Sequence, residues 1–381
     1  MIVEWVFWMA ISLVAYSYIV YPALMFVVGR RAGRPVSPPP SGEQPRVAVV
    51  LAAFNEERHI EGRIRNVAEL DYPAGKVVVY VGSDGSTDAT STLALRHAGE
   101  RVRVFPFAQR RGKASVLNDL LAEVDEEIVV FTDANTKFEA GALRALVAHF
   151  ADPTVGAVSG ELRLGNPEHG DNQDAEYWRV ETAIKLGEAS VGGLLGANGG
   201  IYAIRRELYR PLRPDTIVDD FTVVMNVSVL GSRAVFEPAA LAFEDTPPGI
   251  DHEFRRRVRI GIGNYQAFFR HPEYWLRATW MRRFTYVSHK VLRWFTPHLL
   301  IVAFVASLVL APRSPYAQLL AAQILAYGFL GLGMLLRRYV LFPRVISIPL
   351  FVFALNVAFI VAFCRYLAND FSGMWRTTQR A

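Results

Sequence analysis

The sequence predicts an α/β protein with a mainly parallel sheet, flanked by transmembrane helices. Hydrophobic residues make up 52% and charged residues 20% of the 381 residues, which is too apolar for a soluble protein and too charged for a membrane bundle. In the middle of the chain, apolar segments of strand length alternate with helical segments. Long uncharged segments lie on both sides of this region.

The first predicted element is a transmembrane helix at residues 1–30. One acidic residue, Glu4, interrupts its apolar part, which is long enough to cross a hydrocarbon core of about 30 Å. The segment has neither the basic start nor the small-residue cleavage site of a secretory signal, so we expect it to be retained. By the positive-inside rule, Arg30, Arg31 and Arg34 place the following domain in the cytoplasm.

A proline-rich stretch, residues 31–45, is predicted to be an extended linker, and residues 46–270 to be the α/β domain. The apolar runs in this domain are nearly continuous, as is typical of strands covered on both faces. We expect strands at 46–54, 76–82, 102–105, 127–132 and 155–159. We expect helices at 56–69, 86–97, 113–124 and 140–150. A sheet of this kind binds ligands beyond the carboxyl ends of its strands.

The rest of the chain is predicted to return to the membrane. Residues 271–293 mix aromatic and arginine side chains, as an amphipathic helix in the membrane interface does. Residues 294–368 contain three uncharged segments of transmembrane type, and residues 369–381 form a tail. Four spans with the N-terminus outside would leave the basic tail outside, against the charge rule. We therefore expect one C-terminal segment to be interfacial or re-entrant, near 339–349.

The charge indicates which ligands the chain binds, and the cysteine content excludes two kinds of site. The net charge is +5, and arginines cluster beside apolar segments, which favours lipid headgroups and phosphorylated substrates over nucleic acid. These clusters lie at 30–34, 255–259, 282–283 and 337–338. The single Cys364 excludes an intramolecular disulfide and a cysteine-based zinc site.

Polar residues mark the ends of the predicted strands. The residues after the first strand are Ala53, Phe54, Asn55 and Glu56, for which a helix N-cap is an equally good interpretation. Asp84 follows the second strand, where an Asx turn is the alternative. Asp133 ends the fourth strand in the same way. Two carboxylates at one edge of a parallel sheet favour a site for a metal ion and phosphates.

Three further motifs have both a structural and a functional interpretation. Lys113 follows a glycine at a helix start, an arrangement that suits a phosphate but is also found in ordinary basic loops. Asn198, Gly199 and Gly200 are compatible with a simple glycine-rich turn. The pair Asp219–Asp220 precedes a predicted helix at 221–230, where acidic residues are common for electrostatic reasons alone.

Together the motifs resemble those of the family 2 glycosyltransferases of the GT-A fold. The resemblance covers residues 46–270, and the flanking membrane helices are similar to those of polysaccharide-synthase-type members. The motifs, in order, are AAFNEE, GSDGSTDAT, RRGKASVLN, FTDANT, GANGGIYAIRR and IVDDFTV. The resemblance implies an inverting transfer of sugar from a nucleotide-diphosphate sugar, commonly a UDP-sugar, with Mg²⁺ or Mn²⁺ as cofactor.

The resemblance also implies roles for the nucleotide-binding residues. The segment from Ala53 to Glu56, together with Asp84, would hold the base and ribose, and Lys113 would lie near the nucleotide. Asp133 and Asn135 would bind the metal and the diphosphate. Asn135 stands where a second carboxylate is expected, so the site should hold metal less tightly. We interpret this asparagine as the trait of a subgroup that remains active.

The remaining implied roles concern the acceptor side. Asn198, Gly199 and Gly200 would line the acceptor and sugar pocket. Asp220 would be the catalytic base, and Asp219 would support it. Arg257 would contact the diphosphate, although its arginine cluster is equally suited to lipid headgroups.

Residues 254–258 differ from the Gln-x-x-Arg-Trp motif of processive synthases, because Arg257 is present but Gln and Trp are absent. We therefore expect a single transfer to a lipid-linked or glycan acceptor at the cytoplasmic face of the inner (plasma) membrane, in cell-surface polysaccharide or glycoconjugate synthesis. One alternative is a processive synthase of the cellulose, hyaluronan or poly-GlcNAc type. Another is a non-catalytic nucleotide-sugar-binding subunit of an export or synthesis complex.

Overall fold

The computed structural model describes the chain except for residues 33–43, 166–172, 246–249, 338, 341 and 372–381. Most of the predicted linker at 31–45 and of the tail at 369–381 therefore lies outside the described residues. Contacts divide the chain into two units. The helical unit comprises Met1–Leu24, Gly249–Phe268 and Tyr286–Phe371. Among the described residues, the sheet unit comprises those from Met25 to Pro248 and Phe269–Thr285.

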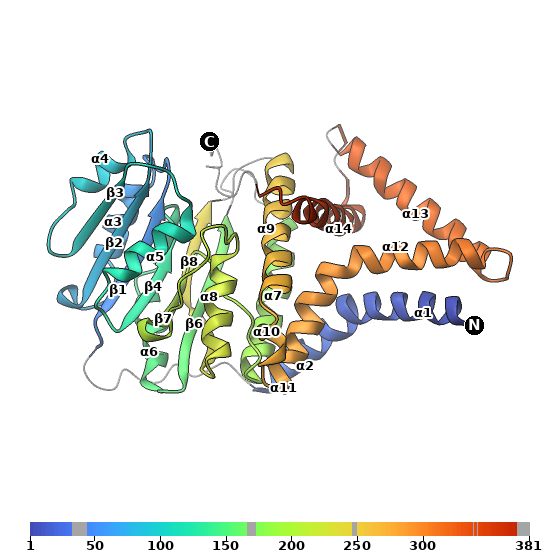
Figure 1. Cartoon of the computed structure of the whole chain (residues 1–381), viewed down its shortest axis with the longest axis horizontal. Coiled ribbons are helices and arrows are strands. Elements are labelled where there is room, and N and C mark those ends of the chain that lie inside the picture. Colours follow the sequence, from blue (N-terminus) through green and yellow to red (C-terminus); the bar gives the residue numbers. More distant parts are fainter. Residues whose placement is uncertain (33–43, 166–172, 246–249, 338, 341, 372–381) are drawn as a thin grey trace. The chain divides into compact units, whose positions relative to one another are not determined.

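An eight-stranded sheet forms the centre of the sheet unit, with strand order β3-β2-β1-β4-β7-β6-β8-β5 (Figure 1). The strands are β1 Val47–Ala53, β2 Val77–Asp84, β3 Val102–Phe107, β4 Ile128–Thr132, β5 Thr136–Phe138, β6 Val155–Gly165, β7 Tyr202–Arg205 and β8 Arg233–Asp245. Strands β3, β2, β1 and β4 run parallel, as do β6 and β8. Strand β7 is antiparallel to β4 and β6, and β5 is antiparallel to β8. The prediction of a mainly parallel sheet is confirmed.

Helices cover both faces of this sheet, which explains why its strands are continuously apolar. Alternate residues of β1 enter separate cores, so that every position of the strand is buried. One face packs against α3 (Ile60–Ala68), α4 (Thr90–Leu95) and α6 (Ala142–Ala148). The other packs against α5 (Lys113–Ala122) and α8 (Asp219–Val229). Short 3₁₀ turns lie at Ala74–Lys76, His149–Ala151 and Arg206–Leu208.

The helix α7 (Gln173–Ser190) was not predicted, and neither were β7 and β8. The backbone of α7 approaches that of α2 (Tyr21–Ala32) closely. A Cβ at Gly187 would lie 2.2 Å from the carbonyl oxygen of Met25, and one at Gly29 would lie 3.0 Å from the Gly187 nitrogen. Glycine is therefore required on both helices where they cross.

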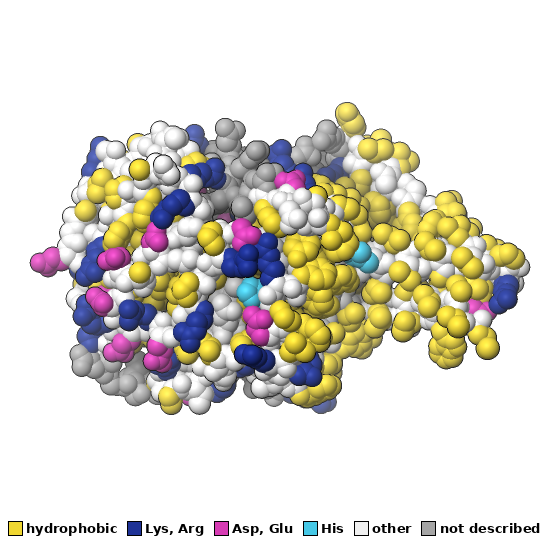
Figure 2. Space-filling model, in the orientation of Figure 1, with side chains coloured by type: hydrophobic (Ala, Val, Ile, Leu, Met, Phe, Trp, Pro, Cys, Tyr) yellow, Lys and Arg dark blue, Asp and Glu magenta, His cyan; other side chains and the backbone are white. Residues whose placement is uncertain are grey.

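The helical unit is rich in long apolar helices. Its elements include α1 (Ile2–Ala15), a π-helical turn Tyr16–Val20, α9 (Ile250–Arg270), α12 (Leu292–Leu310), α13 (Tyr316–Leu336) and α14 (Arg344–Leu367). Within the described residues, four continuous helices are long and apolar enough to cross a membrane: Ile2–Arg31, Trp280–Leu310, Tyr316–Leu336 and Val345–Leu367. Hydrophobic side chains dominate the surface of these helices in Figure 2, whereas charged side chains are spread over the sheet unit. The chain has the character of a membrane protein.

The prediction of one amphipathic interface helix at 271–293 is wrong. The segment instead contains the short α10 (Glu273–Leu276) and α11 (Trp280–Thr285), and α11 continues through a π-helical turn, Tyr286–Val291, into α12. The apolar helix therefore begins at Trp280 and not at residue 294. The charge pattern misled the prediction because the Arg282 side chain is only 6% exposed and is satisfied by protein carbonyls.

A segment near 339–349 was expected to be interfacial or re-entrant. The described residues between α13 and α14 are not helical, and α14 runs from Arg344 through the rest of this segment to Leu367. The placement of this segment in the membrane interface stays a prediction. Pro343 is the N-cap of α14, and Pro349 lies inside the helix. Proline is readily accommodated at the helix start, where the backbone N–H groups have no intrahelical partner, whereas Pro349 lies beyond the first turn and leaves one intrahelical hydrogen bond unmade. The side of the membrane on which the C-terminus lies stays a prediction.

Candidate active site

The loops after β1 and β2 are joined by hydrogen bonds at the carboxyl edge of the sheet. Asn55 adopts a positive φ of 53°, and its Oδ1 accepts a hydrogen bond of 2.8 Å from the Thr87 backbone N–H. The Glu56 N–H donates to Thr90 Oγ1 at 2.7 Å. The segment from Ala53 to Glu56 is thus held in one conformation, and Ala53 itself is fully buried at the end of β1.

Phe54 and Asp84 both contact the loop that precedes α5. The guanidinium of Arg110 lies 3.9 Å from the centre of the Phe54 ring. Asp84 is fully buried, and its two carboxylate oxygens accept hydrogen bonds from the backbone N–H groups of Arg111 and Gly112, at 2.7 and 2.8 Å. Asp84 therefore holds this loop in place, and its contact with the base or ribose of a nucleotide stays a prediction.

A lysine and two aspartates from three separate elements meet at the centre of the site. Lys113 Nζ, at the start of α5, lies 3.0 Å from Asp133 Oδ1 after β4 and 3.1 Å from Asp219 Oδ2 at the start of α8. Burial alone would lower the pKa of Lys113, but the two carboxylates outweigh it and raise the pKa above its ordinary value. Lys113 is therefore a fixed positive charge, as a phosphate-binding site requires.

Asp220 lies beside this cluster in the first turn of α8, which begins two residues earlier than the sequence predicted. Its Oδ1 accepts a 2.8 Å hydrogen bond from the Phe221 N–H, and its Oδ2 lies 3.1 Å from where a Cβ would stand on Gly199. Burial and the neighbouring Asp219 raise the pKa of Asp220 from 3.8 to about 6, against the opposing effect of Lys113. The half-buried carboxylate is thus ionised at neutral pH and is basic enough to accept a proton.

Asn198, Gly199 and Gly200 lie together; the asparagine supports the loop from inside, whereas the two glycines face the site. The Asn198 side chain is buried: its Nδ2 donates to Gly160 O at 2.6 Å, and its Oδ1 accepts a hydrogen bond from Lys185 of α7. Asn198 therefore supports the loop from inside. Gly199 faces Asp220, and a Cβ at Gly200 would lie 2.9 Å from the Thr136 hydroxyl. The absence of side chains at both glycines leaves room beside the carboxylate.

Asp133 and Asn135 are the residues that the sequence suggests for a metal ion. The Asp133 side chain is 34% exposed, so a ligand can reach it. Within the described part of the chain, no group of three or more His, Cys, Asp and Glu residues could hold a metal. One carboxylate and one amide fit a Mg²⁺ or Mn²⁺ ion that takes its other ligands from phosphates and water. The Asn135 amide nitrogen is buried without a hydrogen bond among the described residues, so no such bond opposes rotation of its carbonyl oxygen toward an ion.

Two residues of α3 that the sequence analysis missed fix this segment from behind. Arg63 is 2% exposed; it donates to Thr132 Oγ1 at 2.9 Å, and its guanidinium lies 4.1 Å from the centre of the Phe138 ring. Asn66 exchanges two hydrogen bonds, of 2.9 and 3.0 Å, with the backbone of Phe138. Both sides of the Asp133–Asn135 segment are thereby held. In the sequence, Arg63 has the pattern of an ordinary exposed helix residue.

The far end of α8 is also held by residues that were missed or misassigned. Arg282 donates through its two terminal nitrogens to the carbonyls of Ser228 and Ser232, at 2.5 and 2.6 Å. It thereby caps the carboxyl end of the helix whose first turn carries Asp220. The fully buried Tyr274 donates to Asn226 Oδ1 of the same helix at 2.9 Å.

Arg257 belongs to the helical unit. There its guanidinium lies 5.7 Å from the centre of the Phe351 ring of α14. Its predicted contact with a diphosphate stays a prediction.

The chain is similar to proteins of known family. The family model described as glycosyltransferase-like family 2 matches residues 45–263. Poly-beta-1,6-N-acetyl-D-glucosamine synthase from Staphylococcus aureus (strain COL) is 26% identical over 231 residues, which are 59% of this chain and 56% of the relative. The Staphylococcus epidermidis synthase is 25% identical over 60% of this chain and 56% of its own length. The chain thus spans a little over half the length of the curated relatives that it matches.

One solved structure is similar over nearly the whole chain. It is a mannosyltransferase from Pyrobaculum calidifontis in complex with GDP-Man and Mn²⁺. The two chains share 25% identity with a TM-score of 0.73, and the match covers 96% of this chain and 99% of the other. The similarity therefore includes the helices on both sides of the sheet unit.

Proposed function

The chain belongs to glycosyltransferase family 2, and we propose that it transfers a single sugar from a nucleotide-diphosphate sugar to a lipid-linked or glycan acceptor, with inversion at the anomeric carbon. The observation that carries this proposal is the position of Asp220. It is a carboxylate of raised pKa, open toward Gly199 and adjacent to the cluster of Lys113, Asp133 and Asp219. A proton acceptor next to a phosphate-binding charge is the arrangement that sugar transfer from a diphosphate needs.

In the proposed reaction, the acceptor hydroxyl gives its proton to Asp220 as its oxygen forms a bond to the anomeric carbon. The bond from that carbon to the diphosphate oxygen breaks at the same time, and the nucleoside diphosphate leaves with the electron pair. Lys113 stabilises the charge that develops on the departing diphosphate. Asp219 keeps Lys113 in position and maintains the raised pKa of Asp220. One displacement inverts the anomeric centre, so no covalent enzyme intermediate is needed.

Asp133 and Asn135 are the residues that would hold a divalent ion, Mg²⁺ or Mn²⁺, and such an ion would supply neutralising charge to the diphosphate. The presence of Mn²⁺ with GDP-Man in the mannosyltransferase structure supports this assignment. The same structure makes a GDP-sugar as reasonable a donor to test as the UDP-sugar that is commonest in the family.

A second candidate function, processive synthesis, is favoured by the similarity to poly-beta-1,6-N-acetyl-D-glucosamine synthases. Single transfer is favoured by the absence of the Gln and Trp of the processive motif around Arg257. It is also favoured by the nearly complete length match to a mannosyltransferase. The raised pKa of Asp220 argues against a non-catalytic binding subunit, because such a subunit needs no base.

We place the reaction at the cytoplasmic face of the inner membrane, where nucleotide sugars are made. The arginines after the first apolar helix support this orientation. A role in the synthesis of cell-surface glycans, alone or in an export complex, is consistent with such a location.

The test uses the full chain in lipid nanodiscs with UDP-glucose, UDP-N-acetylglucosamine and GDP-mannose in turn, each with Mn²⁺ or Mg²⁺ and an extract of lipid-linked acceptors. Mass spectrometry should show an acceptor whose mass has increased by one sugar residue. A ladder of many added residues would support the processive alternative instead. Donor binding without any product, from each nucleotide sugar and in the presence of acceptor, would support the binding-subunit alternative.

A further inference from the structure

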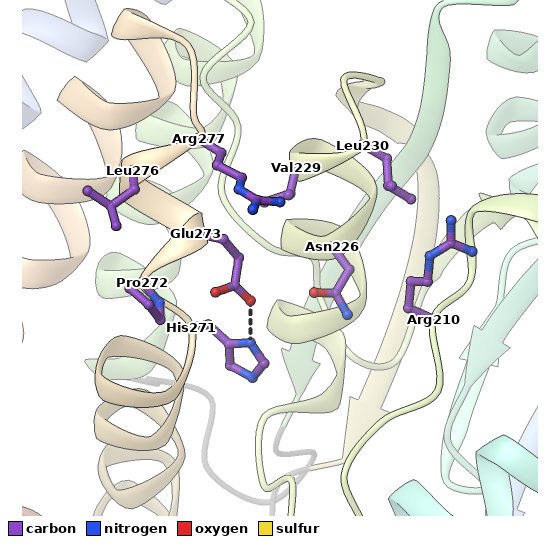
Figure 3. Close-up of a pocket in the computed structure, with 9 residues that line it drawn as sticks. All are labelled: Arg210, Asn226, Val229, Leu230, His271, Pro272, Glu273, Leu276 and Arg277. Carbon is purple, nitrogen blue, oxygen red and sulfur yellow. Dashed lines mark hydrogen bonds and ion pairs between the residues drawn. The ribbon is translucent and has the colours of Figure 1, made fainter.

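A pocket of about 430 Å³ lies at the opposite end of α8 from Asp220 (Figure 3). Its walls come from three parts of the sheet unit. The carboxyl-terminal half of α8 contributes Asn226, Val229 and Leu230, the loop after β7 contributes Arg210, and the segment around α10 contributes the rest. Val229 is about 13 Å along the helix from Asp220, at 1.5 Å per residue. The pocket is therefore separate from the proposed reaction centre.

The charged side chains of this pocket leave an excess of positive charge. Glu273 is already bound to His271, with 2.8 Å between its Oε1 and the His271 Nδ1 (Figure 3). Arg277 comes from the α10 segment and Arg210 from the loop after β7, and neither has an ion-pair partner among the residues that the structure describes (Figure 3). Two guanidinium groups in one pocket suit a phosphate, which accepts hydrogen bonds from several directions.

The segment around α10 exposes apolar side chains, of which Leu276 lines the pocket. Leu276 is 59% exposed and Trp275 is 37% exposed. Trp280, at the start of the apolar helix Trp280–Leu310, is 74% exposed. Tryptophans at the end of a membrane-crossing helix are typical of the headgroup region of a bilayer. The pocket thus combines a site for an anion with side chains suited to the acyl boundary.

We propose that this pocket binds the phosphate headgroup of an anionic membrane lipid. Arg210 and Arg277 bind the phosphate, and Leu276 and Trp280 contact the beginning of the acyl chains. A lipid is favoured over a soluble anion because Arg277 and the exposed apolar side chains of Leu276 and Trp280 lie within one short segment that leads directly into a membrane helix.

The bound headgroup would also stabilise the catalytic helix. The pocket joins α10 to α8 beside two existing contacts, from Tyr274 to Asn226 and from Arg282 to Ser228. A ligand that bridges Arg277 and Arg210 adds a link between the membrane-proximal segment and the loop after β7, in a pocket that the carboxyl-terminal half of α8 also lines. Lipid binding should therefore raise the thermal stability of the full chain.

The experiment is native mass spectrometry of the full chain in detergent, with added phosphatidylglycerol or phosphatidylcholine. The wild type should retain phosphatidylglycerol in preference to phosphatidylcholine. Since each surface arginine near an anionic membrane contributes roughly fivefold, the double variant Arg210→Gln/Arg277→Gln should weaken retention about 25-fold. Val229→Phe should weaken it without any change of charge, because the ring fills the pocket.

Arg206→Gln is the matched control, because Arg206 is exposed in the loop after β7 that also carries Arg210 but does not line the pocket. An equal loss in this variant would show diffuse surface attraction and overturn the proposal. Inorganic phosphate that competes with the lipid at equal concentration would also overturn it, by identifying a site for small anions. Without lipid, the double variant Arg210→Gln/Arg277→Gln and the control variant should both keep the wild-type melting temperature, because the substituted side chains are exposed. If the double variant is well folded and retains the lipid as the wild type does, the proposal is contradicted.

Discussion

The two adjacent aspartates at the start of α8 allow a prediction about pH dependence. The pKa of Asp220 is raised from 3.8 to about 6, first by burial and second by Asp219. Asp219→Asn removes a negative charge but keeps the shape of the side chain. It also releases Lys113 from a 3.1 Å ion pair, so that the lysine can stabilise ionised Asp220 more strongly. Both effects lower the pKa of Asp220.

The expected size follows from the order of the causes. Burial is the larger contribution and is unchanged in Asp219→Asn, so we expect the pKa to fall by about one unit, toward 5. An acid of pKa 6 is roughly 10% ionised at pH 5, whereas an acid of pKa 5 is roughly half ionised. The rate at pH 5, relative to the plateau, should therefore rise about fivefold, even if the plateau itself falls.

The assay is kcat/KM for sugar transfer between pH 4.5 and 8 in nanodiscs, each profile normalised to its own plateau. In the wild type, activity should be lost as the pH falls through about 6, because protonated Asp220 cannot accept a proton. Asp71→Asn is the control, since Asp71 is an exposed partner of Arg144 away from the site. An acid limb that stays in place or moves to higher pH in Asp219→Asn would refute the assignment of Asp220 as the base.

Three further predictions concern packing, the loop before α5 and the metal. Gly187→Ala should lower the free energy of unfolding by about 1–3 kcal/mol, and with it the melting temperature, because the added Cβ would lie 2.2 Å from a backbone oxygen. Gly62→Ala should not lower the melting temperature, because nothing lies within 4 Å of the added Cβ. Asp84→Ala should weaken donor binding in calorimetry by about 1–3 kcal/mol, because two backbone N–H groups lose their acceptor; unchanged affinity would contradict this. Asn135→Asp should lower the Mn²⁺ concentration needed for half-maximal activity, since it restores a carboxylate; a higher requirement would exclude Asn135 as a ligand.

The sheet and much of its binding edge could be predicted from local pattern. Parallel strands buried on both faces are continuously apolar, and the residues that end them must meet at one edge. Asp84 and Asp133 were therefore placed at that edge from spacing alone. The roles expected of Asp219 and Asp220 depended on the family resemblance, because an acidic pair at a helix start is common for electrostatic reasons. Their position beside Lys113 was not predicted.

What could not be predicted depends on contacts between distant parts of the chain. Arg282 was assigned to lipid headgroups, but it caps α8 through carbonyls about fifty residues away in sequence. Arg63 was overlooked because nothing in its neighbourhood indicates that it is buried behind Asp133. A charged side chain beside an apolar segment has the same local pattern whether it faces lipid, solvent or a carbonyl group.

The most direct test of the proposed mechanism compares Asp220→Asn with the wild type in the same nanodiscs. Isothermal calorimetry measures binding of the nucleotide sugar in the presence of Mn²⁺, and mass spectrometry measures the glycosylated acceptor. Loss of a general base should lower the rate by about 10²–10⁴-fold while donor affinity is retained. A variant that binds the donor and transfers sugar at the wild-type rate would contradict the central claim that Asp220 accepts the proton of the acceptor hydroxyl.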